Sequence, residues 1–256
     1  MRSVLKYPGS KWRIAQQIVA QIPQHHSYVE PYFGSGAVFF HKKPSNIDTI
    51  NDLDDDVVNL FRIIRENPKP LIKAIELTPF SRTEYEEAYS QEPDTDSIER
   101  ARKFLIRCWQ GHGFRTTGEI VGWKNDVQGR EAAYAVRHWY HLPQWISVVV
   151  ERLREVQIEH RPALEVIKRF NNEKVFIYAD PPYVLSTRCR KNYNHEMTDN
   201  DHIELLQALI QHKGTAIISG YECDMYNDLL RGWGKMHFQT LDQLSQKRIE
   251  TIWIKR

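Results

Sequence analysis

The segment that most limits how this chain can fold is Asp180-Pro181-Pro182-Tyr183, which directly follows the apolar run 175–179. Such a run predicts a buried strand. The two prolines then fix two backbone φ angles and bring no N–H groups of their own, so the turn is rigid. Ligands of open α/β sheets bind at the carboxyl ends of strands. The tetrapeptide is therefore the first candidate for a functional site.

The chemistry of this turn points to a particular kind of ligand. Asp180 supplies a charged acceptor, Pro181 a fixed carbonyl acceptor and Tyr183 an aromatic plate. Together they suit a planar ring with an exocyclic NH2 group, such as adenine or cytosine taken out of a duplex. The alternative interpretation is a plain turn at the end of a strand, which Asp and Pro both favour.

The amino-terminal part predicts the start of a parallel sheet. Strands are expected at 28–30 and 47–52, helices at 10–22, 37–43 and 54–66, and a turn containing Gly34 and Gly36 at 31–36. This βαβα order is typical of strands joined by crossover helices. The glycines allow close approach of a ligand, although Phe39 replaces the third glycine of the dinucleotide fingerprint. Asp52 ends the second strand, where an acid commonly binds ribose hydroxyls; the alternative is a helix N-cap.

The rest of the chain divides into a helical middle and a second α/β part. A capping box at Ser81, helices at 96–110, 130–141 and 143–155, and a glycine-rich hairpin or loop at 111–126 are expected in the middle. Strands are expected afterwards at 156–160, 175–179 and 215–219, helices at 164–170, 199–212 and 223–231, and an antiparallel pair at 235–241 and 248–254. We therefore predict one α/β domain from 1–66 and 156–256, interrupted by a mainly helical insertion at 67–155.

Charge patterning indicates where nucleic acid would bind. The 256-residue chain carries a net charge of only +2, yet 100–140 holds eight basic and three acidic residues. This favours phosphate contact by the insertion, with Arg115 and Lys124 as candidates. A second basic cluster, Arg188, Arg190 and Lys191, follows the tetrapeptide. The alternative for each residue is a solvated helix face, and Trp109 and Trp123 are further candidates for DNA contact.

Four segments together resemble one family. KYPGSK (6–11), YVEPYFGSGAVFF (28–40), INDLDDDVVNLF (50–61) and YADPPY (178–183) occur in the order found in the alpha-group N6-adenine DNA methyltransferases, which include the GATC-type enzymes of bacteria and phages. The resemblance covers roughly 1–66 and 160–256. It implies a Rossmann-like class I methyltransferase sheet, with the helical insertion as a target-recognition domain. It also implies S-adenosylmethionine as methyl donor and N6 of adenine in double-stranded DNA as acceptor.

The resemblance also implies roles for individual residues. The catalytic positions are Asp180, Pro181, Pro182 and Tyr183. The cofactor-binding positions are Tyr7, Lys11, Glu30, Gly34, Gly36, Asp52 and Asp180. In the implied mechanism, a flipped adenine stacks on Tyr183 and donates from N6 to Asp180 and the Pro181 carbonyl. The methyl group then passes directly from sulfur to nitrogen, without a metal or a covalent intermediate. The segment YPGSK departs from the family's aromatic-Ala-Gly-Gly-Lys form, which bears on Tyr7 more than on Lys11.

Other classes of protein are less consistent with the sequence. No apolar run reaches the 18 or so residues of a membrane span, and three separated cysteines predict a reducing compartment. We expect a cytoplasmic location, in a bacterium or, for a phage-encoded protein, in its host. An N4-cytosine or RNA adenine methyltransferase and a catalytically silent DNA-binding relative remain alternatives, and a nucleotide-dependent oxidoreductase is disfavoured. A restriction endonuclease partner, the recognition sequence and the oligomeric state stay open.

Overall fold

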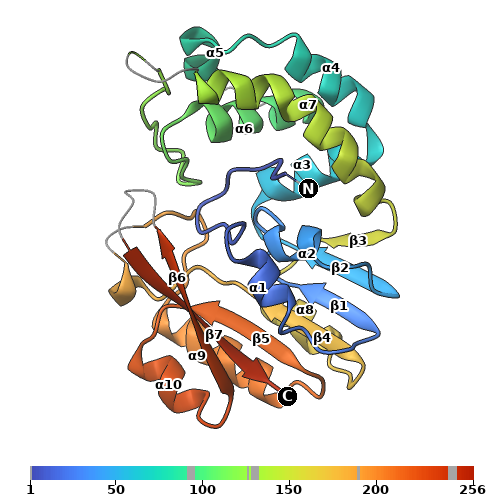
Figure 1. Ribbon diagram of the computed structural model, residues 1–256, viewed down its shortest axis with the longest axis vertical. Helices are drawn as coiled ribbons and strands as arrows, with labels where there is room; N and C mark the ends of the chain where they lie inside the picture. Colours follow the sequence, from blue (N-terminus) through green and yellow to red (C-terminus); the bar gives the residue numbers. More distant parts are fainter. Residues whose placement is uncertain (1, 91–95, 126, 128–132, 189–190, 242–246) are drawn as a thin grey trace.

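A seven-stranded sheet forms the centre of the molecule (Figure 1). The computed structural model describes residues 2–90, 96–125, 127, 133–188, 191–241 and 247–256. In the order β3-β2-β1-β4-β5-β7-β6 the first five strands run parallel, and β7 is antiparallel to both β5 and β6. The strands are β1 Ser27–Glu30, β2 Ile47–Asn51, β3 Val156–Glu159, β4 Val175–Ala179, β5 Ala216–Gly220, β6 Gly234–Leu241 and β7 Lys247–Lys255.

Helices cover both faces of this sheet, which confirms the expected Rossmann-like α/β class. Along β1 and β4, alternate side chains point to opposite faces. Tyr28 and Phe176 join a core with α1, α2 and α3. Val29 and Ile177 join a second core with α8, α9 and α10. The covering helices are α1 Ala15–Val19, α2 Ala37–His41, α3 Asp55–Glu66, α8 Ala163–Arg169, α9 Asp199–Gln211 and α10 Asp224–Leu229.

A helical layer lies against one end of the sheet, at the top of Figure 1. It comprises α4 Pro68–Glu76, α5 Arg82–Glu87, α6 Ser97–Gln110 and α7 Tyr134–Leu153. Its core is continuous with that of α1–α3. Arg152 near the end of α7 pairs with the buried Asp48 of β2 at 2.7 Å, which anchors the layer to the sheet. No helix in the described part of the chain is both long and apolar enough to cross a membrane.

Several predicted element boundaries were wrong. The helix expected at 54–66 is confirmed as α3, but Pro68 then begins a further helix, α4, where a missing N–H costs nothing because the first helical N–H groups have no intrahelical partner. The helices expected at 130–141 and 143–155 are one helix, with Pro143 inside it. Ser81 makes no capping hydrogen bond. The helix expected at 10–22 is only α1, flanked by tighter turns at Ile14 and Ile22.

Candidate functional site

A large cavity opens where β1 and β4 end. The chain reverses its direction of travel across the sheet between these two neighbouring strands, and such a switch point is where open α/β sheets bind ligands. The cavity has a volume of about 1380 Å³, larger than the roughly 300–1,000 Å³ of a single small-molecule site. It therefore has room for two ligands side by side. Its walls include these predicted residues: Tyr7, Lys11, Glu30, Gly34, Asp52, Asp180, Pro181, Pro182, Tyr183, Arg115, Lys124 and Arg188.

The loop after β1 is shaped by two glycines. Gly34 has φ +48° and Gly36 has φ +65°, both in the left-handed region where a side chain is strained. A Cβ on Gly34 would lie 3.0 Å from the ring of Tyr7, so this ring packs directly on the loop. Gly36 does not line the cavity; its N–H closes the turn by donating to the Phe33 carbonyl at 2.7 Å.

Asp52 follows β2 and holds this loop in place. Its carboxylate accepts hydrogen bonds from the N–H of Gly34 at 2.7 Å and of Asp54 at 2.9 Å. Burial raises the pKa of Asp52 to about 6, although these backbone hydrogen bonds oppose the rise. Tyr7 is tied to the same segment, because its hydroxyl donates to Asp54 at 3.1 Å. The structure brings Tyr7, Gly34 and Asp52 together, as expected; ribose binding by Asp52 stays a prediction.

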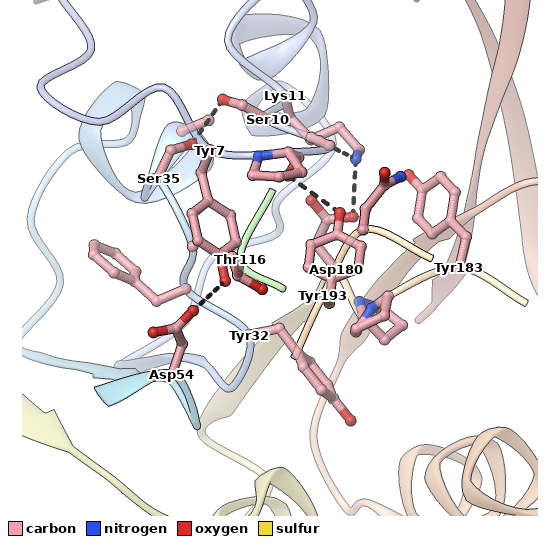
Figure 2. A pocket seen from close by; sticks show the side chains of 18 of the residues that line it. Tyr7, Ser10, Lys11, Tyr32, Ser35, Asp54, Thr116, Asp180, Tyr183 and Tyr193 are labelled. Carbon is pink, nitrogen blue, oxygen red and sulfur yellow. Dashed lines mark hydrogen bonds and ion pairs between the residues drawn. The ribbon is translucent and has the colours of Figure 1, made fainter. Parts of the chain in front are cut away.

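Lys11 crosses the cavity to the catalytic candidate (Figure 2). Its buried amino group lies 3.0 Å from Asp180 Oδ1 and donates to the Gly9 carbonyl at 2.6 Å. Burial alone would lower the pKa of Lys11, but Asp180 and Glu250 outweigh burial and raise it. Lys11 is therefore a fixed positive charge, and it is paired with the carboxylate of Asp180.

Asp180 and a second carboxyl group of the cavity wall, Glu30, both have raised pKa values. Burial raises the pKa of Asp180 to about 6 against the effect of Lys11, and Glu250 adds to the rise. Burial also raises the pKa of Glu30 to about 8, although the Tyr28 hydroxyl donates a hydrogen bond to it. Carboxyl groups with raised pKa values around one cavity are typical of a functional site.

Tyr183 is held at both ends of its side chain. Its hydroxyl donates to Glu250 on β7, and its ring meets Tyr221 edge-on at 4.7 Å. Lys11 Nζ lies 4.7 Å from the ring centroid. The hydroxyl contact was missed by the sequence reasoning, because Glu250 belongs to the closing hairpin and carries no motif of its own.

Within the predicted basic cluster after the tetrapeptide, Arg188 is already engaged inside the protein. Arg188 pairs with Glu196 in a nearly buried contact and donates to the Tyr183 carbonyl at 2.8 Å. We therefore withdraw Arg188 as a DNA contact. Lys191 is exposed, and Arg190 lies outside the described residues.

The loop that contains this pair also contacts the helical layer and the amino terminus. Glu196 accepts from the N–H of Asn192 at 2.7 Å. The Thr116 hydroxyl accepts from the N–H of Asn194 at 2.7 Å. Tyr193 donates to the Pro8 carbonyl at 3.1 Å. Three segments distant in sequence thus meet at the cavity rim, a junction that no local pattern could have predicted.

Several basic residues of 100–140 are also engaged within the protein. Arg100 and Arg107 both pair with Asp56 of α3, and Arg102 pairs with Glu84 and Glu99. The excess of positive charge in this segment therefore overstated its capacity for phosphate. Trp109 is buried and donates to the Val4 carbonyl, so it belongs to the core rather than to a DNA surface.

Other basic side chains of the segment face the cavity. Arg115 pairs with Glu119, whose side chain is 60% exposed. Lys124 donates to the Trp109 carbonyl at 3.0 Å, and Lys6 lies over the Trp109 ring at 4.1 Å. Burial, together with Lys124, lowers the pKa of Lys6 to about 7. Two lysines thus lie close together, and neither forms an ion pair within the described part of the chain.

Of the two forms expected for 111–126, a hairpin or an ordered loop, the structure shows the ordered loop over the described residues, closed by one bridge. Gly111 and Trp123 form an antiparallel bridge, and the Tyr85 hydroxyl donates to the Val121 carbonyl. The segment is otherwise an ordered loop over its described residues, 111–125. Among the residues that the structure describes, no three His, Cys, Asp or Glu side chains are grouped so as to hold a metal ion.

Comparison with known proteins shows which family and which relatives this chain resembles. The profile described as D12 class N6 adenine-specific DNA methyltransferase matches residues 7–250. A type II methyltransferase of Methanocaldococcus jannaschii is 22% identical over 91% of this chain and 89% of its own length. A type II methyltransferase of Lactococcus lactis subsp. cremoris is 30% identical over 77% and 71%. The DNA adenine methylase of Escherichia coli K12 is 22% identical over 86% and 81%.

Proposed function

Because the chain belongs to the D12 class of N6 adenine-specific DNA methyltransferases, we propose that the cavity between β1 and β4 holds S-adenosylmethionine beside an adenine flipped out of duplex DNA. The protein is a site-specific DNA adenine methyltransferase, and the N4-cytosine, RNA and silent alternatives are not favoured. The observation that carries the proposed site is the meeting of the glycine loop, Lys11 and Asp180 at one switch point.

The residues around the glycine loop fit the cofactor. Gly34 lets the backbone approach a nucleoside closely, and Asp52 stands beside it as a carboxylate acceptor for ribose hydroxyls. Asp52, which is largely ionised at neutral pH, adds a negative charge suited to a ligand that carries a sulfonium and an ammonium group, and Glu30 lies on the same cavity wall. When bound, S-adenosylmethionine supplies a methyl group activated by its positively charged sulfur. The chain's own contribution is to hold donor and acceptor in line, which removes most of the entropic cost of the encounter.

Asp180 and its neighbours fit the acceptor base. Lys11 is bound to Asp180 Oδ1, so the second carboxylate oxygen is the one we assign to the adenine amino group. The ionised carboxylate stabilises the positive charge that develops on N6, an effect strongest in the transition state. The Pro181 carbonyl is the second acceptor, and the Tyr183 ring is the surface against which the base packs. Extraction of the base from the stack is required because N6 cannot reach the cavity from within a duplex.

The helical layer supplies the DNA contacts in this proposal. We assign residues 67–155 to target recognition and 1–66 with 156–256 to catalysis. Lys6 and Lys124 together form a positive patch on the cavity wall, and Arg115 and Lys191 are the further phosphate candidates. The type II names of two relatives support the further proposal that a restriction endonuclease accompanies this protein in the cytoplasm of its host.

The proposal is tested by sequencing the DNA that the protein modifies. DNA from methylation-deficient cells expressing the wild type should carry N6-methyladenine at one short motif, as detected by single-molecule sequencing. Cells expressing Asp180→Asn should carry little or none. Methylation at cytosine N4, or no methylation by a folded wild type that binds the cofactor, would overturn the assignment.

A further inference from the structure

Glu250 lies next to the proposed catalytic residues but far from them in sequence. It sits on β7, opposite Phe238 in the closing hairpin, 67 residues after Tyr183. Its side chain is only 12% exposed, and its carboxylate accepts the hydrogen bond from the Tyr183 hydroxyl. A carboxylate that accepts from a tyrosine hydroxyl forms a charge-assisted hydrogen bond, which is shorter and stronger than one between neutral groups.

The same carboxylate reaches the other side of the site. Glu250 lies 3.9 Å from Lys11 Nζ, and Asp180 lies 3.0 Å from the same nitrogen. The ammonium group is therefore shared by two carboxylates, one from the catalytic turn and one from the hairpin. Because Lys11 also donates to the Gly9 carbonyl, it cannot move without breaking several contacts.

These contacts restrain the orientation of the Tyr183 ring. Packing against Tyr221 limits its tilt, and the contact of the hydroxyl with Glu250 fixes the far end of the side chain. Proximity effects fall off steeply when reacting groups are displaced by about 1 Å. Because the Tyr183 ring supports the flipped base in the proposed function, a second contact that fixes this ring should change the rate of methyl transfer.

We propose that Glu250 is a positioning residue for methyl transfer, which fixes the Tyr183 ring through its hydroxyl and holds Lys11 against Asp180. The inference rests on the proposed role of the 180–183 turn and adds to it a residue of the closing hairpin that acts through Tyr183 and Lys11. It predicts that Glu250 acts on the rate of transfer rather than on binding of the cofactor.

A double-mutant cycle between Glu250→Gln and Tyr183→Phe tests this coupling. We expect each single change to lower the single-turnover rate on duplex DNA by about tenfold or more, the size expected for loss of a hydrogen bond to a charged group. The double variant should be within about twofold of the slower single variant, because both changes break one contact. Affinity for S-adenosylmethionine, measured by calorimetry, should stay within about threefold of the wild type in the Glu250→Gln variant.

The pH dependence separates positioning from a purely structural effect. The charged and titratable groups around Asp180 are Lys11, Glu30, Tyr178, Tyr183, Tyr193, Tyr226 and Glu250. Glu250 raises the pKa of Asp180, whereas the Tyr183 hydroxyl lowers it. Glu250→Gln should thus move the acidic limb of the rate profile to lower pH, whereas Tyr183→Phe should move it to higher pH.

Glu222→Gln is the matched control, since Glu222 is an exposed acid paired with Lys235 of β6. It should leave the rate and the pH profile unchanged. A Glu250→Gln rate within about twofold of wild type, or effects that simply multiply in the double variant, would overturn the inference while leaving the function intact. Should Glu250→Gln fail to fold, a wild-type rate for folded Tyr183→Phe would overturn it equally. An inactive wild type would instead count against the proposed function.

Discussion

At the scale of single residues, the cavity is distinguished by carboxyl groups that are costly to keep charged. Burial raises the pKa of Glu30 to about 8 and that of Asp52 and Asp180 to about 6. Each group would be more stable in water, so the folded state gives up stability to hold them there. Such a trade-off between stability and activity is typical of functional sites.

The state of Asp180 should set the acidic limit of activity. Because its pKa is about 6, the fraction ionised falls as the pH drops through that value, and the single-turnover rate should fall in parallel. Asp180→Asn keeps an acceptor oxygen but removes the charge, and should lower the rate on the order of 100-fold at pH 7.5. Rates measured from pH 5 to 8 at saturating cofactor and DNA check this. A flat profile through pH 6 would contradict it.

Glu30 should make the protein less stable at alkaline pH. Its folded pKa of about 8 lies above its usual value of 4.5, so between these limits the folded state binds more protons than the unfolded state. By linkage, the free energy of unfolding must decrease as the pH rises through this window. Glu30→Gln should remove this decrease and be more stable than wild type at pH 8. Urea unfolding at pH 5 and pH 8 measures the free energy of unfolding at each pH. An equal decrease between these pH values in both proteins would argue against the prediction.

Lys6 should make DNA binding depend on pH. Burial and Lys124 lower its pKa to about 7, so it loses its positive charge as the pH rises above that value. Affinity for duplex DNA should weaken by about tenfold or more between pH 6.5 and 8.5, the worth of one hydrogen bond from a charged group. Fluorescence anisotropy at constant salt checks this. Lys6→Gln should show a much smaller change, whereas the exposed Lys43→Gln should behave as wild type.

At the scale of elements, the loop after β4 depends on one ion pair. Burial alone would raise the pKa of Glu196, but Arg188 and the N–H groups of Asn192 and Tyr193 outweigh burial and lower it. The pair therefore stabilises the protein at neutral pH, and its contribution is lost as the pH falls below the usual value for a glutamate. The loop joins the tetrapeptide to Thr116 of the helical layer.

Breaking this pair should loosen both the loop and the fold. Glu196→Gln leaves the Arg188 guanidinium nearly buried without its carboxylate, which should cost about 3 kcal/mol of unfolding free energy at pH 7.5. At a pH well below the usual pKa of glutamate, the difference from wild type should shrink. Denaturant unfolding at both pH values measures this. Glu119→Gln breaks an exposed pair and should change stability by less than about 0.5 kcal/mol; an equal loss in both variants would rule out a special role for the buried pair.

At the scale of the whole molecule, cofactor binding should stabilise the sheet that forms the cavity. A ligand at 100 times its Kd adds about 2.7 kcal/mol, which for a chain of this size should raise the Tm by roughly 5–10 °C. S-adenosylmethionine should produce this shift in the wild type. Asp52→Ala should show a clearly smaller one, since losing a charged acceptor weakens binding by about 1–3 kcal/mol. The control is Asp55→Ala, a change at an exposed position, which should show the full shift in Tm. A full shift in Asp52→Ala would remove Asp52 from the site.

The sequence by itself determined the sheet, the order of its elements and the position of the cavity. Strand β4 was predicted residue for residue, and β1 and β2 to within a residue at each end. Apolar periodicity and turn residues are local properties of the sequence, so they can be recognised without knowledge of the fold. Because parallel strands end at one edge of a sheet, the motifs that follow β1, β2 and β4 had to meet there.

Only the tertiary structure decided which partner each charged side chain takes. Arg188 looked like a phosphate ligand in the sequence, yet Glu196 neutralises it, and Asp56 likewise neutralises Arg107 of the positively charged segment. Glu250 looked like an ordinary strand residue, yet it binds Tyr183. The reason is physical: a charge excess counts residues within a window, whereas an ion pair depends on which surfaces pack together. Partners distant in the chain meet only once the helices and the closing hairpin have docked on the sheet.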